Sequence, residues 1–139
     1  MNKLNYALVG YGLNAMGHKM ELESHPLLKG RTKLIAGFDP DPIGKKNLMN
    51  EEGIKITESY EDLLDISELD AVLICSPPQY HAEQTIAALE AGYHVYSEIP
   101  MCIKEKDIEK IINAEESSKK VYQLGENYCF YPEVLYASY

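Results

Sequence analysis

Short apolar runs alternate with segments of helical period along the chain. The clearest run is Ala71–Cys75, and five consecutive apolar residues suit a strand that is buried on both faces. Between such runs, apolar side chains recur about every 3.6 residues, which indicates amphipathic helices. Strand–helix–strand repetition with short connections predicts an α/β fold. We expect a Rossmann-type, doubly wound parallel sheet with helices on both faces.

The expected boundaries follow the apolar runs and the residues that stop helices. Strands are predicted at residues 6–9, 33–38, 53–57, 71–75, 93–96 and 121–125, and helices at residues 13–23, 43–52, 60–64, 79–91 and 104–118. Gly53 and Gly92 directly follow two of these helical segments, where glycine often ends a helix. With 139 residues, the chain is about one domain long.

Charge and composition argue against several classes of function. The net charge of −9 disfavours nucleic acid and anionic membrane surfaces, both of which attract basic proteins. No stretch approaches the roughly 18 apolar residues of a membrane-spanning helix, and the first residues lack a secretory-signal pattern. A cytoplasmic protein is therefore expected. The three cysteines show no CxxC spacing, so neither a metal site nor a disulfide framework is predicted.

The first predicted strand runs into a glycine-containing turn, Gly10-Tyr11-Gly12-Leu13-Asn14-Ala15. In a GxGxxA pattern, the first glycine permits a tight turn and the second lets the backbone approach a pyrophosphate. The small third residue allows close packing between helix and strand. Free N–H groups at the start of the following helix attract the anion. The turn therefore predicts a dinucleotide site.

An acidic residue, Asp39, ends the second predicted strand. It occupies about the position of the carboxylate that accepts both ribose hydroxyls of NAD. A 2′-phosphate there would face Asp39 and Asp41, with Lys45 and Lys46 as the nearby cations. We therefore expect NAD to be preferred over NADP. On the residues alone, an ordinary strand–turn–helix with an incidental aspartate is the alternative.

Further motifs follow in a fixed order. They are Val9-Gly10-x-Gly12 through His18, Ser76-Pro77-Pro78-x-x-His81, Ala88-Leu89-x-Ala91-Gly92-x-His94-Val95, Glu98-Ile99-Pro100 and Asn127-Tyr128-Cys129-Phe130. Together they resemble the N-terminal nucleotide-binding domain of the glucose–fructose oxidoreductase/inositol dehydrogenase (Gfo/Idh/MocA) family. The resemblance spans essentially the whole chain.

The resemblance implies a set of cofactor-binding positions. They are Gly10, Gly12, Leu13 and Asn14 in the pyrophosphate loop, Asp39 at the ribose, Ser76, Pro77, Pro78 and His81 after the fourth strand, Glu98 and Ile99 under the nicotinamide, and Asn127 near the junction with a second domain. For His81, a structural role at the start of a helix is an equally good interpretation. His18 and His94 are expected to be packing or surface residues.

The chain also departs from the family pattern. The family's lysine before Pro100 is Ile99 here, and the arginine of its Asn-Tyr-Arg-Phe motif is Cys129. The family's substrate domain, with its Asp/His catalytic pair, has no counterpart in the sequence. We therefore predict an NAD(P)-binding Rossmann domain over residues 1–126 and the start of a truncated substrate domain over residues 127–139. The catalytic residues are unknown, and a cis Ile99–Pro100 bond is expected.

The resemblance implies the NAD-binding part of an oxidoreductase that transfers hydride between NAD and a sugar or polyol hydroxyl. The 139-residue chain alone is expected to be inactive, and a homo-oligomer is expected. Two alternatives stay open. Ile99 favours a non-catalytic NAD-binding sensor or scaffold, because it removes a charged donor. A methyltransferase also carries an acidic residue after its second strand, but the motifs that follow disfavour it.

Overall fold

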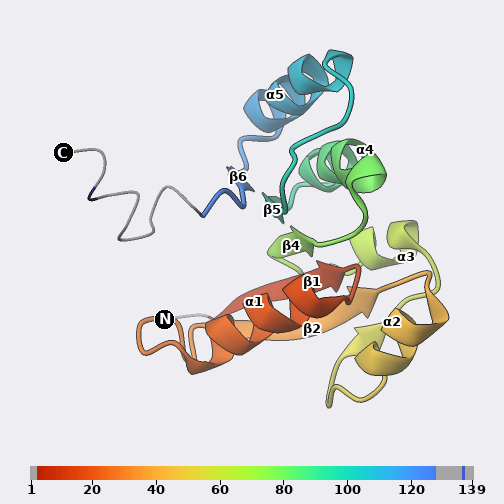
Figure 1. The fold of residues 1–139 in the computed structure, drawn as a ribbon, viewed down its shortest axis with the longest axis vertical. Coiled ribbons are helices and arrows are strands. Elements are labelled where there is room, and N and C mark those ends of the chain that lie inside the picture. Colours follow the sequence, from red (N-terminus) through yellow and green to blue (C-terminus); the bar gives the residue numbers. More distant parts are fainter. Residues whose placement is uncertain (1–2, 128–135, 137–139) are drawn as a thin grey trace.

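The computed structural model describes residues 3–127 and residue 136. Six parallel strands form one sheet in the order β3-β2-β1-β4-β5-β6 (Figure 1). The strands are β1 (Leu4–Val9), β2 (Thr32–Phe38), β3 (Lys55–Ile56), β4 (Ala71–Ile74), β5 (His94–Ser97) and β6 (Tyr122–Leu124). The strand order reverses between β1 and β4, so the predicted Rossmann-type parallel sheet is confirmed.

Helices cover both faces of the sheet. They are α1 (Leu13–Ser24), α2 (Pro42–Leu48), α3 (Tyr60–Leu64), α4 (Pro78–Glu90) and α5 (Lys106–Ser118). In Figure 1, α1 crosses in front of β1 and β2, while α4 and α5 lie beside each other over the β4–β6 half. Each helix lies between two consecutive strands of the chain and forms the crossover that connects these parallel strands.

Strand β1 lies at the centre of the sheet, and its side chains pack into hydrophobic clusters on both faces. Tyr6 and Leu8 are buried on one face, in a cluster that includes Ala15 of α1 and Leu48 of α2. Ala7 and Val9 of β1 are buried on the other face, in a cluster with residues of α3, α4 and α5. This alternation explains why residues 6–9 of β1 are buried and apolar, and it holds the glycine turn after the strand in a fixed place.

Helix α2 is shorter than its predicted range of residues 43–52. It ends at Leu48, the last buried residue of this segment, and Met49 is 61% exposed. Beyond it, the backbone N–H groups of Asn50 and Glu51 donate to carbonyls three residues earlier, and Gly53 has φ +72°. Residues 49–52 gain no burial from a longer helix, so the chain tightens into turns instead.

The carboxyl ends of the central strands are joined by hydrogen bonds beyond the strands themselves. The N–H of Gly10 donates to Phe38 O at 2.9 Å, that of Cys75 to Val9 O at 2.8 Å, and that of Glu98 to Ile74 O at 2.9 Å. The loops that follow β1, β2, β4 and β5 therefore meet at one edge of the sheet. Ligands of open α/β sheets bind at this kind of edge.

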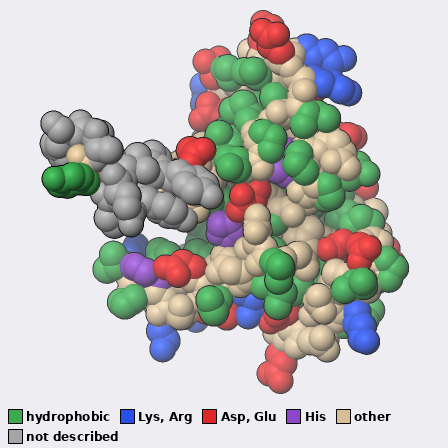
Figure 2. Space-filling model, in the orientation of Figure 1, with side chains coloured by type: hydrophobic (Ala, Val, Ile, Leu, Met, Phe, Trp, Pro, Cys, Tyr) green, Lys and Arg blue, Asp and Glu red, His purple; other side chains and the backbone are tan. Residues whose placement is uncertain are grey.

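The surface shows no single dominant feature on the face drawn in Figure 2. Lys and Arg side chains lie mainly at the margins of that face, and acidic and apolar side chains are spread between them. Among the described residues, no helix is long and apolar enough to cross a membrane. Within the same residues, no group of three or more His, Cys, Asp and Glu side chains is arranged to hold a metal ion.

Candidate dinucleotide site

Gly10 links the loops that follow β1 and β4. Its φ is +80°, a conformation that L side chains rarely adopt. A Cβ at this position would lie 2.6 Å from the backbone nitrogen of Ser76 and 2.7 Å from its Cα. Only glycine allows the two backbones to approach this closely, so Gly10 fixes the turn from which the next helix starts.

The N-terminus of α1 is left open by Gly12. Within the described part of the chain, no side chain caps the helix at Gly12, and a Cβ there would meet no atom within 4 Å. The first turn carries no acidic side chain to compete for the free N–H groups. A 12-residue helix with an uncapped N-terminus offers partial positive charge and N–H donors to a phosphate.

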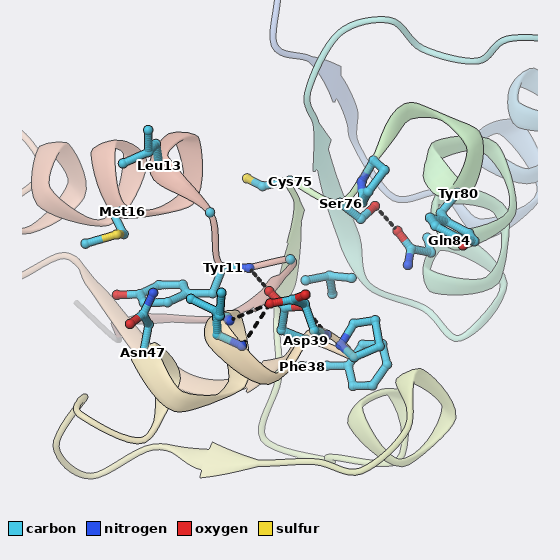
Figure 3. Close-up of a pocket in the computed structure, with 18 of the residues that line it drawn as sticks. Tyr11, Leu13, Met16, Phe38, Asp39, Asn47, Cys75, Ser76, Tyr80 and Gln84 are labelled. Atoms are coloured by element: carbon cyan, nitrogen blue, oxygen red, sulfur yellow. Dashed lines mark hydrogen bonds between the residues drawn. The ribbon is translucent and has the colours of Figure 1, made fainter.

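A cavity of about 1060 Å³ lies in front of this turn. It is bounded by α1, α2, the end of β2 and the loop that leads into α4 (Figure 3). Its lining includes Gly10, Gly12, Leu13, Asp39, Ser76 and Pro77, which brings together residues from three separate predicted motifs. The cavity is therefore large enough for a nucleotide and opens at the predicted edge of the sheet.

Asp39 is fixed at the end of β2 by two backbone N–H groups. Its Oδ2 accepts a hydrogen bond from Tyr11 N at 2.6 Å, and its Oδ1 accepts one from Asp41 N at 2.9 Å (Figure 3). A carboxylate that accepts backbone N–H groups is held in one orientation. Asp39 therefore presents a fixed acceptor beside the glycine turn, on the wall of the cavity.

Tyr11 anchors the glycine turn through its buried side chain. Its side chain is buried between α1 and α2, and its hydroxyl donates to Glu51. Lys19 of α1 contacts both Glu23, at 2.8 Å, and Glu51, at 3.1 Å. Burial and the hydrogen bond to Glu51 raise the pKa of Tyr11, so its hydroxyl keeps its proton. The turn is therefore tied through Tyr11 to the segment after α2.

Cys75 and Ser76 line the cavity at the end of β4. The Ser76 hydroxyl donates to Gln84 Oε1 at 2.5 Å, which fixes the loop before α4 (Figure 3). Cys75 also lines the cavity, and its thiol pKa is raised to about 12 by burial, with a smaller contribution from the charge of Glu98. A thiol with this pKa stays protonated at neutral pH and is a poor nucleophile.

His81 connects two loops from the inside of the protein. It is 1% exposed, with Nδ1 2.8 Å from Pro100 O and Nε2 2.7 Å from Ser76 O. The ring therefore lies behind the cavity wall and holds the loop after β4 against the turn after β5.

The turn after β5 is held by α1. Glu98 Oε1 lies 2.5 Å from His18 Nε2, and the His18 ring meets the edge of Tyr96 at a centroid distance of 5.1 Å. Ile99 is 39% exposed, and its peptide bond to Pro100 is cis, as expected. His18, expected only to pack or to face solvent, thus has a defined polar partner 80 positions away in the sequence.

The cavity lining does not include the other expected site residues, which are Asn14, Pro78, His81, Glu98, Ile99 and Asn127. Asn14 and Pro78 are exposed in the first turns of α1 and α4, and Asn127 is exposed at the end of the continuously described chain. The expected tail motif at residues 128–130 lies outside the described residues. Conversely, the cavity lining includes residues that the sequence analysis did not select: Met16, Phe38, Pro40, Ile43, Gly44, Asn47, Gln79, Tyr80 and Gln84.

These features fit a dinucleotide. The open position at Gly12 leaves space for a pyrophosphate against the N-terminus of α1, and the carboxylate of Asp39 can accept hydroxyl donors. Both lie on the wall of the same cavity. The donor and acceptor set therefore matches a phosphate and a ribose.

Sequence comparison finds related proteins that are longer than this chain. A 4-carboxy-2-hydroxymuconate-6-semialdehyde dehydrogenase from Sphingobium sp. is 38% identical over 69 residues, which make up 50% of this chain and 22% of that protein. A glycosyl hydrolase family 109 protein from Shewanella pealeana is 30% identical over 136 residues, covering 91% of this chain and 29% of that protein. The matched residues therefore make up less than a third of either relative.

Solved structures with the same fold include dehydrogenases with bound cofactor. The WlbA dehydrogenase from Chromobacterium violaceum, in complex with NADH and UDP-GlcNAcA, is 29% identical with a TM-score of 0.89. The match covers 98% of this chain and 39% of that one. Scyllo-inositol dehydrogenase from Lactobacillus casei, with NAD(H) and scyllo-inositol, is 27% identical with a TM-score of 0.84, over 98% of this chain and 40% of that one.

Residues 4–126 match the sequence profile described as the GFO_IDH_MocA oxidoreductase family, NAD-binding Rossmann fold. This range contains the complete sheet, the glycine turn, Asp39 and the loops after β4 and β5. Its motifs, its topology and its structural neighbours agree. The chain belongs to the GFO_IDH_MocA family of oxidoreductases and carries the family's NAD-binding Rossmann fold.

Proposed function

We propose that this chain binds NAD(H) in preference to NADP(H), for hydride transfer to or from a sugar or polyol hydroxyl in a longer protein. The observation that carries the cofactor preference is the fixed carboxylate of Asp39 beside the glycine turn. It can accept the 2′- and 3′-hydroxyls of a ribose. A 2′-phosphate would face the charges of Asp39 and Asp41, both on the cavity wall, and like charges about 4 Å apart cost about 4 kcal/mol at an effective dielectric constant near 20.

Each part of the cavity wall has a role in this proposal. Gly12 and the N-terminus of α1 hold the pyrophosphate, and Asp39 orients the ribose. The loop at Ser76 and Pro77, fixed through Gln84 and His81, closes one side of the site. Glu98 and Ile99, in the turn after β5 and outside the lining of this cavity, would lie at the nicotinamide end of the ligand. When bound, the nicotinamide supplies the hydride acceptor or donor.

The substrate side of the proposal is supported by the relatives. The two dehydrogenases compared above were solved with UDP-GlcNAcA and with scyllo-inositol, which both carry ring hydroxyls. Both proteins are more than twice as long as this chain. We therefore propose a cofactor domain over residues 1–126 and the start of a substrate domain at residues 127–139. The chain alone then binds cofactor without turnover, because nothing holds a substrate at reacting distance.

Cofactor titration tests the first part of the proposal. The 139-residue chain and its Asp39→Asn variant are titrated with NAD and NADP by calorimetry. The wild type should bind NAD more tightly, and Asp39→Asn should weaken NAD by roughly tenfold or more, as the loss of a hydrogen bond to a charged group predicts. Asp62→Asn, on the exposed side of α3, is the matched control. Equal affinity of the wild type for both cofactors would contradict the proposed role of Asp39.

A non-catalytic NAD-binding sensor is the second candidate function. It is favoured by Ile99, whose branched alkyl side chain has neither a proton nor a charge to offer at the nicotinamide side. Adding Ile99→Lys to a longer protein that contains this chain separates the candidates. If a polyol dehydrogenase lacks only this donor, turnover should rise by about 10²–10⁴-fold, the usual contribution of one acid–base group. Binding of NADH without turnover in both proteins, across a polyol panel, would support the sensor.

A further inference from the structure

Gly44 lies where α2 passes closest to Asp39. A Cβ built on Gly44 would lie 1.9 Å from Oδ2 of Asp39 and 2.4 Å from its Cγ. Real Cβ atoms do not approach other atoms this closely, so any side chain at this position displaces the carboxylate. Gly44 is itself buried and lines the cavity together with Asp39.

A glycine inside α2 needs a reason, because glycine weakens a helix relative to alanine. Gly44 is the third of the seven residues of α2, after Pro42 and Ile43. Its φ is not in the left-handed region, which in this chain is occupied by four other glycines. Backbone conformation therefore does not require glycine at this position. The space occupied by the Asp39 carboxylate does.

Because Gly44 has no side chain, the backbone of α2 can lie against the Asp39 carboxylate and help to hold it in place. On one side, Oδ2 accepts the N–H of Tyr11, and Oδ1 accepts the N–H of Asp41. On the other side, the same Oδ2 is in contact with the backbone of α2 at Gly44. The carboxylate therefore fits into a slot between the glycine turn and α2 (Figure 3).

We propose that Gly44 is a specificity-determining residue for the dinucleotide, because it sets the position from which Asp39 meets the ribose. This inference deepens the proposed function and rests on it. Neither the GxGxxA pattern nor the acidic residue after β2 contains Gly44. Its effect on the ligand is exerted through Asp39, so it is a positioning residue and not a catalytic one.

Replacing Gly44 by alanine has a defined consequence. The Asp39 carboxylate is the end of a short side chain and can turn away, so the backbone of α2 can keep its course. Tyr11 N then loses its acceptor, and the ribose hydroxyls lose theirs. NAD binding should weaken about ten- to hundredfold, the equivalent of one hydrogen bond to a charged group. NADP binding should weaken less, because the displaced carboxylate no longer faces the 2′-phosphate.

The test compares Gly44→Ala with Gly17→Ala in the 139-residue chain. Gly17 is also a helical glycine, in α1, and among the described atoms nothing lies within 4 Å of a Cβ built there. Dissociation constants for NAD and NADP are measured by calorimetry, and melting temperatures without cofactor by circular dichroism. Gly44→Ala should lower the ratio of NAD to NADP affinity, whereas Gly17→Ala should leave it unchanged. An unchanged ratio in Gly44→Ala overturns the inference.

A double-mutant cycle with Asp39→Ala identifies the route of the effect. If Gly44 acts through Asp39, Gly44→Ala should have no effect on NAD affinity once Asp39→Ala is present. An equal loss in both backgrounds would mean that Gly44 contacts the ligand directly, which overturns the inference. If Gly44→Ala alone does not fold, recovery of folding in the double variant supports the contact, and its failure counts against it. A wild-type chain that binds neither cofactor contradicts the proposed function instead.

Discussion

The β1–β2 half and the β4–β5 half of the sheet edge differ in how their loops are held and in what they present to a ligand. On the β1–β2 side, backbone N–H groups and the carboxylate of Asp39 face the cavity, and the supporting contacts come from α1 and α2. On the β4–β5 side, His18 and His81 hold the loops from behind. In the turn after β5, the side chain of Ile99 is 39% exposed and apolar.

This difference separates binding from chemistry. In the proposed function, the β1–β2 half supplies the groups that hold a pyrophosphate and a ribose. The β4–β5 half is held by His18 and His81, and its exposed Ile99 offers no proton donor. The same scaffold can therefore keep its cofactor while the group that handles the proton is supplied from elsewhere in a longer protein, or is absent.

Gly10 stands at the boundary between the halves, and its replacement should have the largest effect. Gly10→Ala would place a Cβ 2.6 Å from Ser76 N in a backbone with φ +80°. The clash is with backbone, which cannot rotate away. We expect a loss of about 3 kcal/mol or more in the free energy of unfolding, measured by denaturant titration.

Gly12→Ala is the matched comparison for Gly10→Ala. Its Cβ would have open space and its φ is −88°, so stability should change by less than about 1 kcal/mol. NAD affinity should nevertheless fall, because the methyl group occupies the position that a pyrophosphate needs. Equal destabilisation by the two variants would show that the two glycines do not have separate roles.

His81→Ala should have the next largest effect, and it probes the β4–β5 half. The substitution leaves a cavity at a 1% exposed position and removes the partner of Ser76 O and Pro100 O. We expect a loss of about 2–4 kcal/mol in the free energy of unfolding. His25→Ala, at a half-buried histidine whose Nδ1 accepts the N–H of Leu27, should cost less than about 1 kcal/mol. If His81 only filled space, His81→Leu would restore the lost stability.

The parts of the molecule that the sequence predicted are those specified by neighbouring residues. Apolar periodicity located the helices and strands, because each element buries one face or both regardless of its partners. The glycine turn and Asp39 were found for the same reason, since position after a strand defines their chemistry. The end of α2 was predicted too late because burial, which stops at Leu48, outweighed the helical propensity of the residues that follow.

The parts that the sequence did not predict are contacts between distant residues. The carboxylate of Glu98 lies against His18 across 80 positions, and the hydroxyl of Tyr11 reaches Glu51 across 40. No local pattern pairs such residues, because the pairing depends on which helix lies over which strand. Gly44 is of the same kind. Its role is visible only once α2 is placed against Asp39.

The contact of Glu51 with Tyr11 and Lys19 should make stability depend on pH. Its effect should be smaller than those of Gly10→Ala and His81→Ala. Burial alone would raise the pKa of Glu51, but the hydrogen bonds from Tyr11 and Lys19 lower it below the ordinary value of 4.5. A carboxyl whose folded-state pKa is lowered contributes stability above its unfolded pKa and loses it as pH falls through the folded one. Glu51→Gln should therefore cost about 1 kcal/mol at neutral pH, and this difference from the wild type should shrink below pH 4.5. Melting temperatures of both proteins across this range measure it.

Glu23→Gln, which removes the more exposed acidic partner of Lys19, should cost less at neutral pH. A difference for Glu51→Gln that stays constant down to low pH would mean that Glu51 supports the turn by packing alone, and the bracing of Tyr11 would not depend on its charge.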